Sequence, residues 1–202
     1  MLGAIIGDVV GSRFEFDNYR KKDFELFDSS CEATDDSIMT LAIGKALVET
    51  SKVYSEIDED YLNLLEKNSI KFMQEIGKKY PNCGFGGRFF KWIFSENPQP
   101  YNSFGNGAAM RVSPVAYFGN TIDEVKELSE VVTKVTHNHP EGLKGAEATA
   151  VSIFMARNGF TIEEIRKEIE ENYYDLDFTI DEIRDSHEFN ETCQDTVPQA
   201  IK

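Results

Sequence analysis

The sequence predicts an all-α fold, a compact orthogonal bundle of several helices, and three observations support this prediction. Apolar side chains recur at intervals near 3.6 residues along most of the chain, which is the period of a helix with one buried face. No stretch shows the apolar and polar alternation of a half-buried strand. Capping-box patterns begin at Thr121, Thr161 and Thr179. We therefore expect helices packed on helices, without a sheet.

The chain has 202 residues, with 21 Lys and Arg against 36 Asp and Glu, so its formal net charge is -15. This length predicts a single domain over residues 1–202. The acidic balance argues against binding to the phosphate backbone of nucleic acids. Three widely spaced cysteines match neither a disulfide framework nor a zinc pattern, which favours the reducing cytoplasm. We expect no signal peptide and no membrane span, because no apolar run approaches about 20 residues.

The first predicted helix covers residues 2–12 and carries Gly3, Gly7 and Gly11 at a spacing of four. Glycines at this spacing leave one helix face as bare backbone, which another helix or a ligand can approach closely. We expect close packing against a helix at Gly3 and Gly7. In the loop that follows, Glu15 lies between two phenylalanines, and an acid among aromatic rings is a candidate for a perturbed pKa.

Thr34, Asp35 and Asp36 directly precede residues 38–48, which are apolar on nearly every face and predict an interior helix. One interpretation is a helix cap, because threonine is a good N-cap and acids suit the positive end of the helix dipole. The other is a cation site. Two adjacent ionised carboxylates facing a packed interior repel each other unless a cation joins them, and such oxygen ligands suit magnesium or manganese.

The middle of the chain contains an amphipathic helix predicted over residues 58–78 and a glycine-rich turn over residues 84–87. A second loop of small residues, 103–107, leads into an apolar helix that ends or kinks at Pro114. Backbone amides at such a helix start can bind phosphate, although a plain Asn-Gly turn explains the same pattern. The sequence leaves open whether Arg111, in this helix, pairs with Asp8 or with a ligand.

The helix that begins after Thr121 leads to His137 and His139, and an alanine-rich helix follows over residues 141–158. Both histidines lie at a junction of two helices, where a ligand could reach them. For His139, directly before a proline, we expect a structural role in which backbone carbonyls satisfy the ring. Two histidines without a third ligand make a poor zinc site.

Four motifs in register carry a resemblance to the ADP-ribosylglycohydrolase family, which includes the dinitrogenase-reductase-activating glycohydrolases. They are Gly-Asp-Val-Val-Gly-Ser-Arg-Phe-Glu at residues 7–15, Thr-Asp-Asp-Ser at 34–37, Gly-Asn-Gly-Ala-Ala-Met-Arg at 105–111 and Thr-His-Asn-His-Pro at 136–140. The resemblance implies an all-α fold, a pair of magnesium or manganese ions, and hydrolysis of the bond joining ADP-ribose to a side chain or small acceptor.

Position by position, the resemblance implies a metal-binding role for Thr34, Asp35 and Asp36, and a catalytic role for Glu15 and Asp35. It places the 84–87 turn on the same rim. It also implies substrate contacts from one loop and one histidine, namely Ser103, Phe104, Gly105, Asn106, Gly107 and His137.

The sequence departs from the family pattern at its C-terminal end. The family has an Asp-x-Asp-Thr metal motif there, whereas Asp175-Leu-Asp177-Phe-Thr179 has its threonine one place late. Residues 196–202 predict a helix with Pro198 in its first turn, yet the chain stops after one turn, which is too short for a stable helix. We therefore expect a fold that is incomplete at the C-terminus and lacks half of the dinuclear site.

The resemblance thus implies a metal-dependent hydrolase that acts on ADP-ribosylated proteins or small ADP-ribosyl compounds. Glu15 would act as general base or position a water molecule. The alternative is a truncated, weakly active or inactive remnant that binds ADP-ribose without hydrolysing it, because half a dinuclear site holds metal weakly.

Overall fold

The computed structural model describes residues 1–17 and 19–202. Within these ranges the chain forms nine α-helices and three short 3-10 helices, and its only strand-like pairing is one isolated bridge between Gly105 and Thr192. The predicted all-α class is therefore confirmed. No helix in the described part of the chain is both long enough and apolar enough to cross a membrane.

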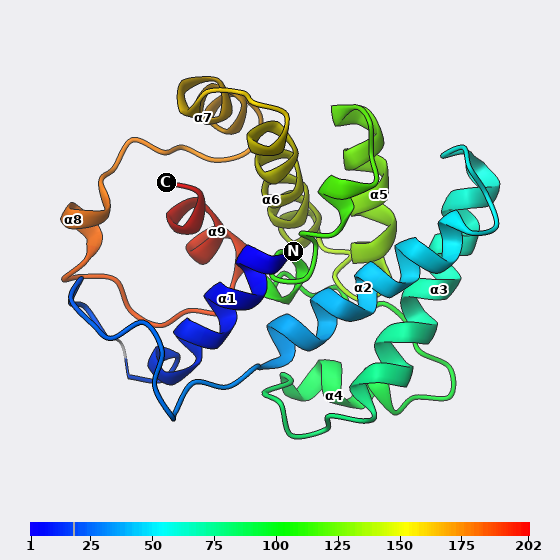
Figure 1. The fold of residues 1–202 in the computed structure, drawn as a ribbon, viewed down its shortest axis with the longest axis horizontal. Coiled ribbons are helices and arrows are strands. Elements are labelled where there is room, and N and C mark those ends of the chain that lie inside the picture. The colour runs from blue at the N-terminus through cyan, green and yellow to red at the C-terminus, as the bar shows by residue number, and fades with distance from the viewer. Residues whose placement is uncertain (18) are drawn as a thin grey trace.

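The elements follow the chain with long loops before α2 and around α8 (Figure 1). The first half contains α1 Leu2–Gly11, the 3-10 helix η1 Ser12–Phe14, α2 Asp35–Ser51, α3 Glu59–Gly77 and α4 Gly87–Ile93. The second half contains η2 Asn106–Ala108, η3 Val115–Tyr117, α5 Ile122–Lys134, α6 Pro140–Arg157, α7 Ile162–Asn172, α8 Ile180–Ile183 and α9 Cys193–Ile201.

Two helix pairs form the body of the bundle, because α2 packs along α3 and α5 packs along α6, while α3 also contacts α5. Helix α1 contacts α2, and α9 rests against α6 (Figure 1). Fully buried side chains from both pairs form one apolar core, including Met39, Ile43, Leu65, Met73, Leu128, Val132 and Val151. The burial of these side chains provides the main driving force for the fold.

Helix α2 follows the prediction at its start and departs from it on one face. Thr34 is the N-cap, and its side chain accepts a hydrogen bond from the Asp36 amide, so the predicted cap is confirmed. The helix is not interior all round, however, since Leu41 is 45% exposed and Val48 is 44% exposed. These two residues lie on the solvent side, because neighbouring elements cover only the other faces of the helix.

The apolar helix predicted after residue 107 does not form. The structure has two 3-10 turns, η2 and η3, joined by an irregular segment in which Arg111 is buried. Pro114 explains the break, because proline lacks an N–H donor and disfavours helical geometry in the preceding residue, Ser113.

The last helix begins earlier than predicted. Helix α9 starts at Cys193 rather than near Thr196, so Pro198 lies inside the helix and not in its first turn. Tertiary contacts determine this start, because the Cys193 amide donates to the Phe104 carbonyl at 2.9 Å, next to the bridge that joins Gly105 to Thr192. The sequence pattern around Pro198 does not contain that information.

Candidate active site

A cavity of about 750 Å³ lies among α1, the start of α2, the 84–88 turn, the 101–113 segment and α9. Of the ten residues predicted to be catalytic, metal-binding or substrate-binding, nine line this cavity: Glu15, Thr34, Asp35, Asp36, Ser103, Gly105, Asn106, Gly107 and His137. Phe104 is the exception, since it is 40% exposed and its ring centroid lies 5.1 Å from that of His139. The structure brings the nine together, and their roles remain predictions.

Asp8 of α1 organises the acidic wall of the cavity. Its carboxylate accepts hydrogen bonds from the Thr34 amide at 3.0 Å, the Thr34 hydroxyl at 2.6 Å and the Ser37 amide at 3.1 Å, as well as from the Ser37 hydroxyl. The Thr34 hydroxyl oxygen in turn accepts from the Asp36 amide at 3.3 Å. Asp8 therefore ties α1 to the first turn of α2 and fixes the orientation of Thr34.

The 84–87 turn holds Asp35 from the opposite side. The Asp35 amide donates to the Cys83 carbonyl at 2.8 Å. Gly84 has φ of +112°, a conformation that favours glycine, and a Cβ atom there would lie 3.0 Å from Oδ1 of Asp35. This turn thus needs glycine for its backbone conformation and for the close approach of the carboxylate, and the structure places it on the rim, as predicted.

Three acids in the cavity hold their protons more tightly than ordinary carboxylic acids. Burial, followed by the charge of Asp36, raises the pKa of Asp35 to about 7. Burial, followed by the charges of Asp8 and Glu15, raises the pKa of Asp36 to about 6. Burial and the charges of Asp8 and Glu191 raise the pKa of Glu15. Burial and mutual repulsion therefore make these three groups harder to ionise than ordinary carboxylic acids, and a cation beside them would favour their ionised forms.

The oxygen atoms of Thr34, Asp35 and Asp36 fit a hard divalent cation in kind, because Mg²⁺ and Mn²⁺ prefer carboxylate and hydroxyl ligands. The raised pKa values of the two aspartates support the same fit. These residues provide fewer ligands than a complete metal site. In residues 1–17 and 19–202, no group of three or more His, Cys, Asp or Glu side chains is arranged to hold a metal ion.

The 103–107 loop forms another part of the cavity wall. Two of its amides already have partners, because Gly105 donates to the Ser103 hydroxyl at 3.2 Å and Asn106 donates to the Glu191 carbonyl at 2.7 Å. The sequence suggested that backbone amides of this loop bind an anion. Such an anion would have to contact amides other than those of Gly105 and Asn106. His137 borders the same loop, since a Cβ atom on Gly107 would lie 3.3 Å from its Nε2.

Arg111 does not pair with Asp8. Its Nη2 donates to the Thr136 hydroxyl at 2.6 Å, and its guanidinium lies 5.6 Å from the centroid of the Phe89 ring.

The expectation that backbone carbonyls satisfy the His139 ring is wrong, because its Nδ1 accepts from the Glu141 amide at 3.1 Å and so caps the start of α6. His139 is nevertheless structural.

The close helix packing expected at Gly3 and Gly7 is wrong. A Cβ atom at Gly3, Gly7 or Gly11 would meet no atom of the described chain within 4 Å. Gly7 and Gly11 instead line the cavity. Their lack of side chains leaves space beside Asp8, which corresponds to the alternative of ligand approach.

Several cavity residues were not among the predicted site residues. Asp8 carries a detectable signal, because it is an isolated acid inside an otherwise apolar helix. Arg88, Tyr101, Phe189 and Glu191 also line the cavity, but nothing in their local sequence distinguishes them from ordinary loop residues. Only folding brings the segment before α9 to the cavity.

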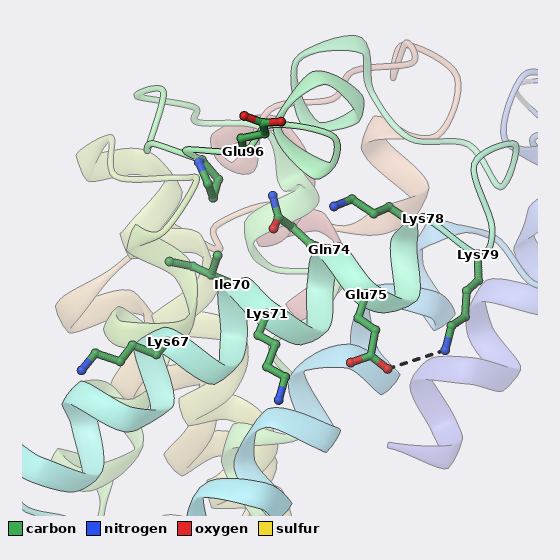
Figure 2. Close-up of a pocket in the computed structure, with 9 residues that line it drawn as sticks. Lys67, Ile70, Lys71, Gln74, Glu75, Lys78, Lys79 and Glu96 are labelled. Atoms are coloured by element: carbon green, nitrogen blue, oxygen red, sulfur yellow. Dashed lines mark ion pairs between the residues drawn. The ribbon is translucent and has the colours of Figure 1, made fainter.

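A second hollow, of about 730 Å³, lies on the outer face of α3 and contains no predicted site residue. It is lined by lysines, and one of them, Lys79, pairs with Glu75 at 3.6 Å (Figure 2). Such exposed lysines are typical of a solvated helix face, so the acidic cavity is the better candidate.

The sequence of this chain is similar to those of known proteins. The sequence model of the ADP-ribosylglycohydrolase family matches residues 1–201. ADP-ribosylhydrolase ARH3 of Homo sapiens is 25% identical, with 93% of this chain and 57% of the relative covered. The protein of that name from Xenopus tropicalis is 26% identical, with 79% and 49% covered. An uncharacterized protein of Archaeoglobus fulgidus is 26% identical, with 84% and 58% covered.

These relatives are longer proteins, and the chain spans only about half the length of the curated relatives that it matches. The family match extends over nearly all of the 202 residues. The chain belongs to the ADP-ribosylglycohydrolase family.

Proposed function

We propose that this chain is a metal-dependent hydrolase that releases ADP-ribose from a modified side chain or small acceptor. The observation that carries the proposal is the meeting of Asp35, Asp36 and Glu15 with the 103–107 loop and His137 around one cavity in a member of this family. The related ARH3 proteins are named ADP-ribosylhydrolases, which supports the same reaction class.

In this proposal Thr34, Asp35 and Asp36 hold Mg²⁺ or Mn²⁺, which when bound supplies positive charge that orients the ribose and polarises oxygen atoms. Asp8 keeps Thr34 in place through its hydrogen bonds. That the site holds a pair of ions, and that these ions are Mg²⁺ or Mn²⁺, is part of the proposal.

Glu15 is the proposed general base. Burial and neighbouring acids raise its pKa, which makes its carboxylate a stronger base than an ordinary one, and it would take a proton from water as the bond between the ribose anomeric carbon and the acceptor breaks. The oxygen of that water forms the new bond to the anomeric carbon, and the acceptor leaves with the proton that Glu15 took from the water, so that Glu15 returns to its carboxylate form. The 103–107 loop and His137 would hold the diphosphate along their part of the cavity wall.

The substrates follow from the same proposal: ADP-ribosylated proteins or small ADP-ribosyl compounds. A cytoplasmic location accords with three free cysteines. A second candidate is a binding protein that holds ADP-ribose without hydrolysing it, and the small number of metal donors in the described chain favours it.

The test is to incubate the 202-residue chain with arginine-linked and serine-linked ADP-ribosyl peptides and Mg²⁺, and to measure free ADP-ribose by chromatography. We expect release by the unmodified chain, a loss of at least 100-fold for Asp35→Ala, because the charge that holds the cation is gone, and no loss for Asp177→Ala. Asp177 is a matched control, since it is an exposed loop acid.

Three results separate the candidates. Release that depends on Asp35 supports the hydrolase. No release, combined with ADP-ribose binding in calorimetry, supports the binding protein. If the chain neither releases nor binds ADP-ribose, both candidates are wrong.

A further inference from the structure

A chain of hydrogen bonds lies behind the 103–107 loop and joins a buried arginine to the histidine of the cavity. Nη2 of Arg111 donates to Oγ1 of Thr136 at 2.6 Å. Oγ1 of Thr136 lies 2.8 Å from Nδ1 of His137. Arg111 is 1% exposed and His137 is 5% exposed, so water does not compete for these bonds.

The donors and acceptors in this series of hydrogen bonds indicate which nitrogen of His137 carries the ring proton. Arg111 can only donate, so the Thr136 oxygen is its acceptor, and the single hydroxyl proton must point elsewhere. The carbonyl of Thr133 lies 3.5 Å away and already accepts the amides of Thr136 and His137 at 3.2 and 2.9 Å. The shorter distance, 2.8 Å to Nδ1 of His137, favours donation by the hydroxyl to that nitrogen, which would place the ring proton on Nε2.

Nε2 of His137 faces the cavity loop. A Cβ atom on Gly107 would lie 3.3 Å from Nε2, and one on Gly105 would lie 3.8 Å away. No hydrogen bond from Nε2 is found within residues 1–17 and 19–202. Burial, followed by the charges of Arg111 and Arg88, lowers the pKa of His137 well below its usual value, so the ring is neutral. It thus presents one N–H donor to the cavity.

Arg111 carries a charge that needs an anion. It forms no ion pair with any acid in the described parts of the chain, and its Nε is buried without a hydrogen-bond partner. A buried cation without a counter-charge is costly, and burial lowers its pKa to about 10. Arg111 also lines the cavity. An anionic ligand would relieve this cost.

We propose that Arg111 and Thr136 are positioning residues that hold His137 as a neutral Nε2–H donor to the diphosphate of an ADP-ribosyl ligand. The guanidinium of Arg111 places positive charge behind that donor. This inference rests on the proposed function for the identity of the ligand, whereas the state of the His137 ring is argued from its hydrogen bonds and its burial.

The test uses the full chain labelled with ¹⁵N-histidine, with the His137 signals assigned by their loss in His137→Asn. Long-range ¹H–¹⁵N spectra report which ring nitrogen carries the proton, and calorimetry measures ADP-ribose affinity. Thr136→Val removes the hydroxyl at nearly constant volume, while Thr136→Ser keeps it. Thr133→Val is the matched control, because the buried Thr133 hydroxyl has no hydrogen-bond partner in the described chain.

We expect the Nε2–H form in the unmodified chain, in Thr136→Ser and in Thr133→Val. Thr136→Val should show a mixture of ring forms and about 10-fold weaker ADP-ribose binding, as for loss of a hydrogen bond to a charged group. An Nδ1–H ring in the unmodified chain overturns the proposal, whether or not the valine variant folds. Equal affinity and ring state in both valine variants also overturn it.

A failure of the proposed function looks different. If the unmodified chain binds no ADP-ribose, the ligand assignment falls together with the proposed function, even where the ring is in the Nε2–H form. If the unmodified chain binds ADP-ribose and Thr136→Val binds it equally well, only the positioning role is wrong.

Discussion

Gly107 is a position at which an added atom would crowd the candidate site. A Cβ atom there would lie 3.3 Å from Nε2 and 3.4 Å from Cε1 of His137. Both distances are short for contact with a buried ring, and the added methyl group would fill the space through which a ligand reaches Nε2. The small size of this residue therefore bears on binding rather than on backbone conformation.

We predict that Gly107→Ala weakens ADP-ribose binding by about 10-fold, since overpacking at a fitted surface typically costs about 1–3 kcal/mol. Calorimetry measures the affinity, and the melting temperature shows whether the fold is intact. Gly3→Ala is the control, because a Cβ atom at Gly3 meets no described atom within 4 Å. Equal affinities for the two variants would show that His137 is not part of the binding wall.

Among single residues, chemistry that is local in the chain was predictable. Thr34, Asp35 and Asp36 are consecutive, so the cap at Thr34 can be read from the sequence, and their cation chemistry stays a prediction. Gly84 is different, because its contact with Asp35 joins positions that are far apart in the chain. Sequence reasoning identified a turn there, but not which carboxylate the turn approaches.

At the scale of elements, α9 links the bundle to the candidate site. Its first residue, Cys193, donates from Sγ to the Gly105 carbonyl at 3.2 Å, while Thr196 and Val197 of the same helix line the cavity. The helix rests on α6 at Gly145, where a Cβ atom would lie 2.7 Å from both Cβ and Sγ of Cys193. The approach of α9 to α6 thus depends on this glycine.

We predict that Gly145→Ala lowers the melting temperature by several degrees, because the backbone of α9 must shift, at a cost of about 1–3 kcal/mol. The same shift should weaken ADP-ribose binding through the 103–107 loop. Gly3→Ala, a second helical glycine in open space, should leave the melting temperature unchanged or slightly higher. A Gly145→Ala variant as stable as Gly3→Ala would contradict the described packing of α9.

At the scale of the whole molecule, the chain carries a net charge of -15, and the acidic cavity contributes to it with five carboxylic acids against two arginines, Arg88 and Arg111. Asp8, Glu15, Asp35, Asp36 and Glu191 all line it. Self-repulsion among these carboxylates destabilises the folded chain and attracts cations. A cation that binds the folded state and not the unfolded state stabilises the fold by mass action.

We predict that millimolar Mg²⁺ raises the melting temperature of the chain by a few degrees above NaCl of equal ionic strength. The comparison with NaCl removes general screening of the net charge. Asp36→Asn should abolish most of the rise, whereas Asp177→Asn, an exposed loop acid, should retain it. Scanning calorimetry measures the shift. The same rise for Asp36→Asn and for the unmodified chain would place the cation elsewhere.

Local sequence patterns were enough to predict the fold class, the starts of most helices and the residues that carry the motifs. These features depend on local periodicity and capping, as at Thr34, Thr161 and Thr179, where the cap and the capped amide are a few residues apart. Such interactions are encoded within one stretch of chain.

Only the tertiary structure decided which of these residues face one another. It opened the glycine face of α1 toward the cavity and brought Glu191 to the cavity lining. It also joined Arg111 to His137 through Thr136. The physical reason is that burial, charge and hydrogen bonding at these positions depend on partners that lie distant in the chain, and no local pattern specifies them.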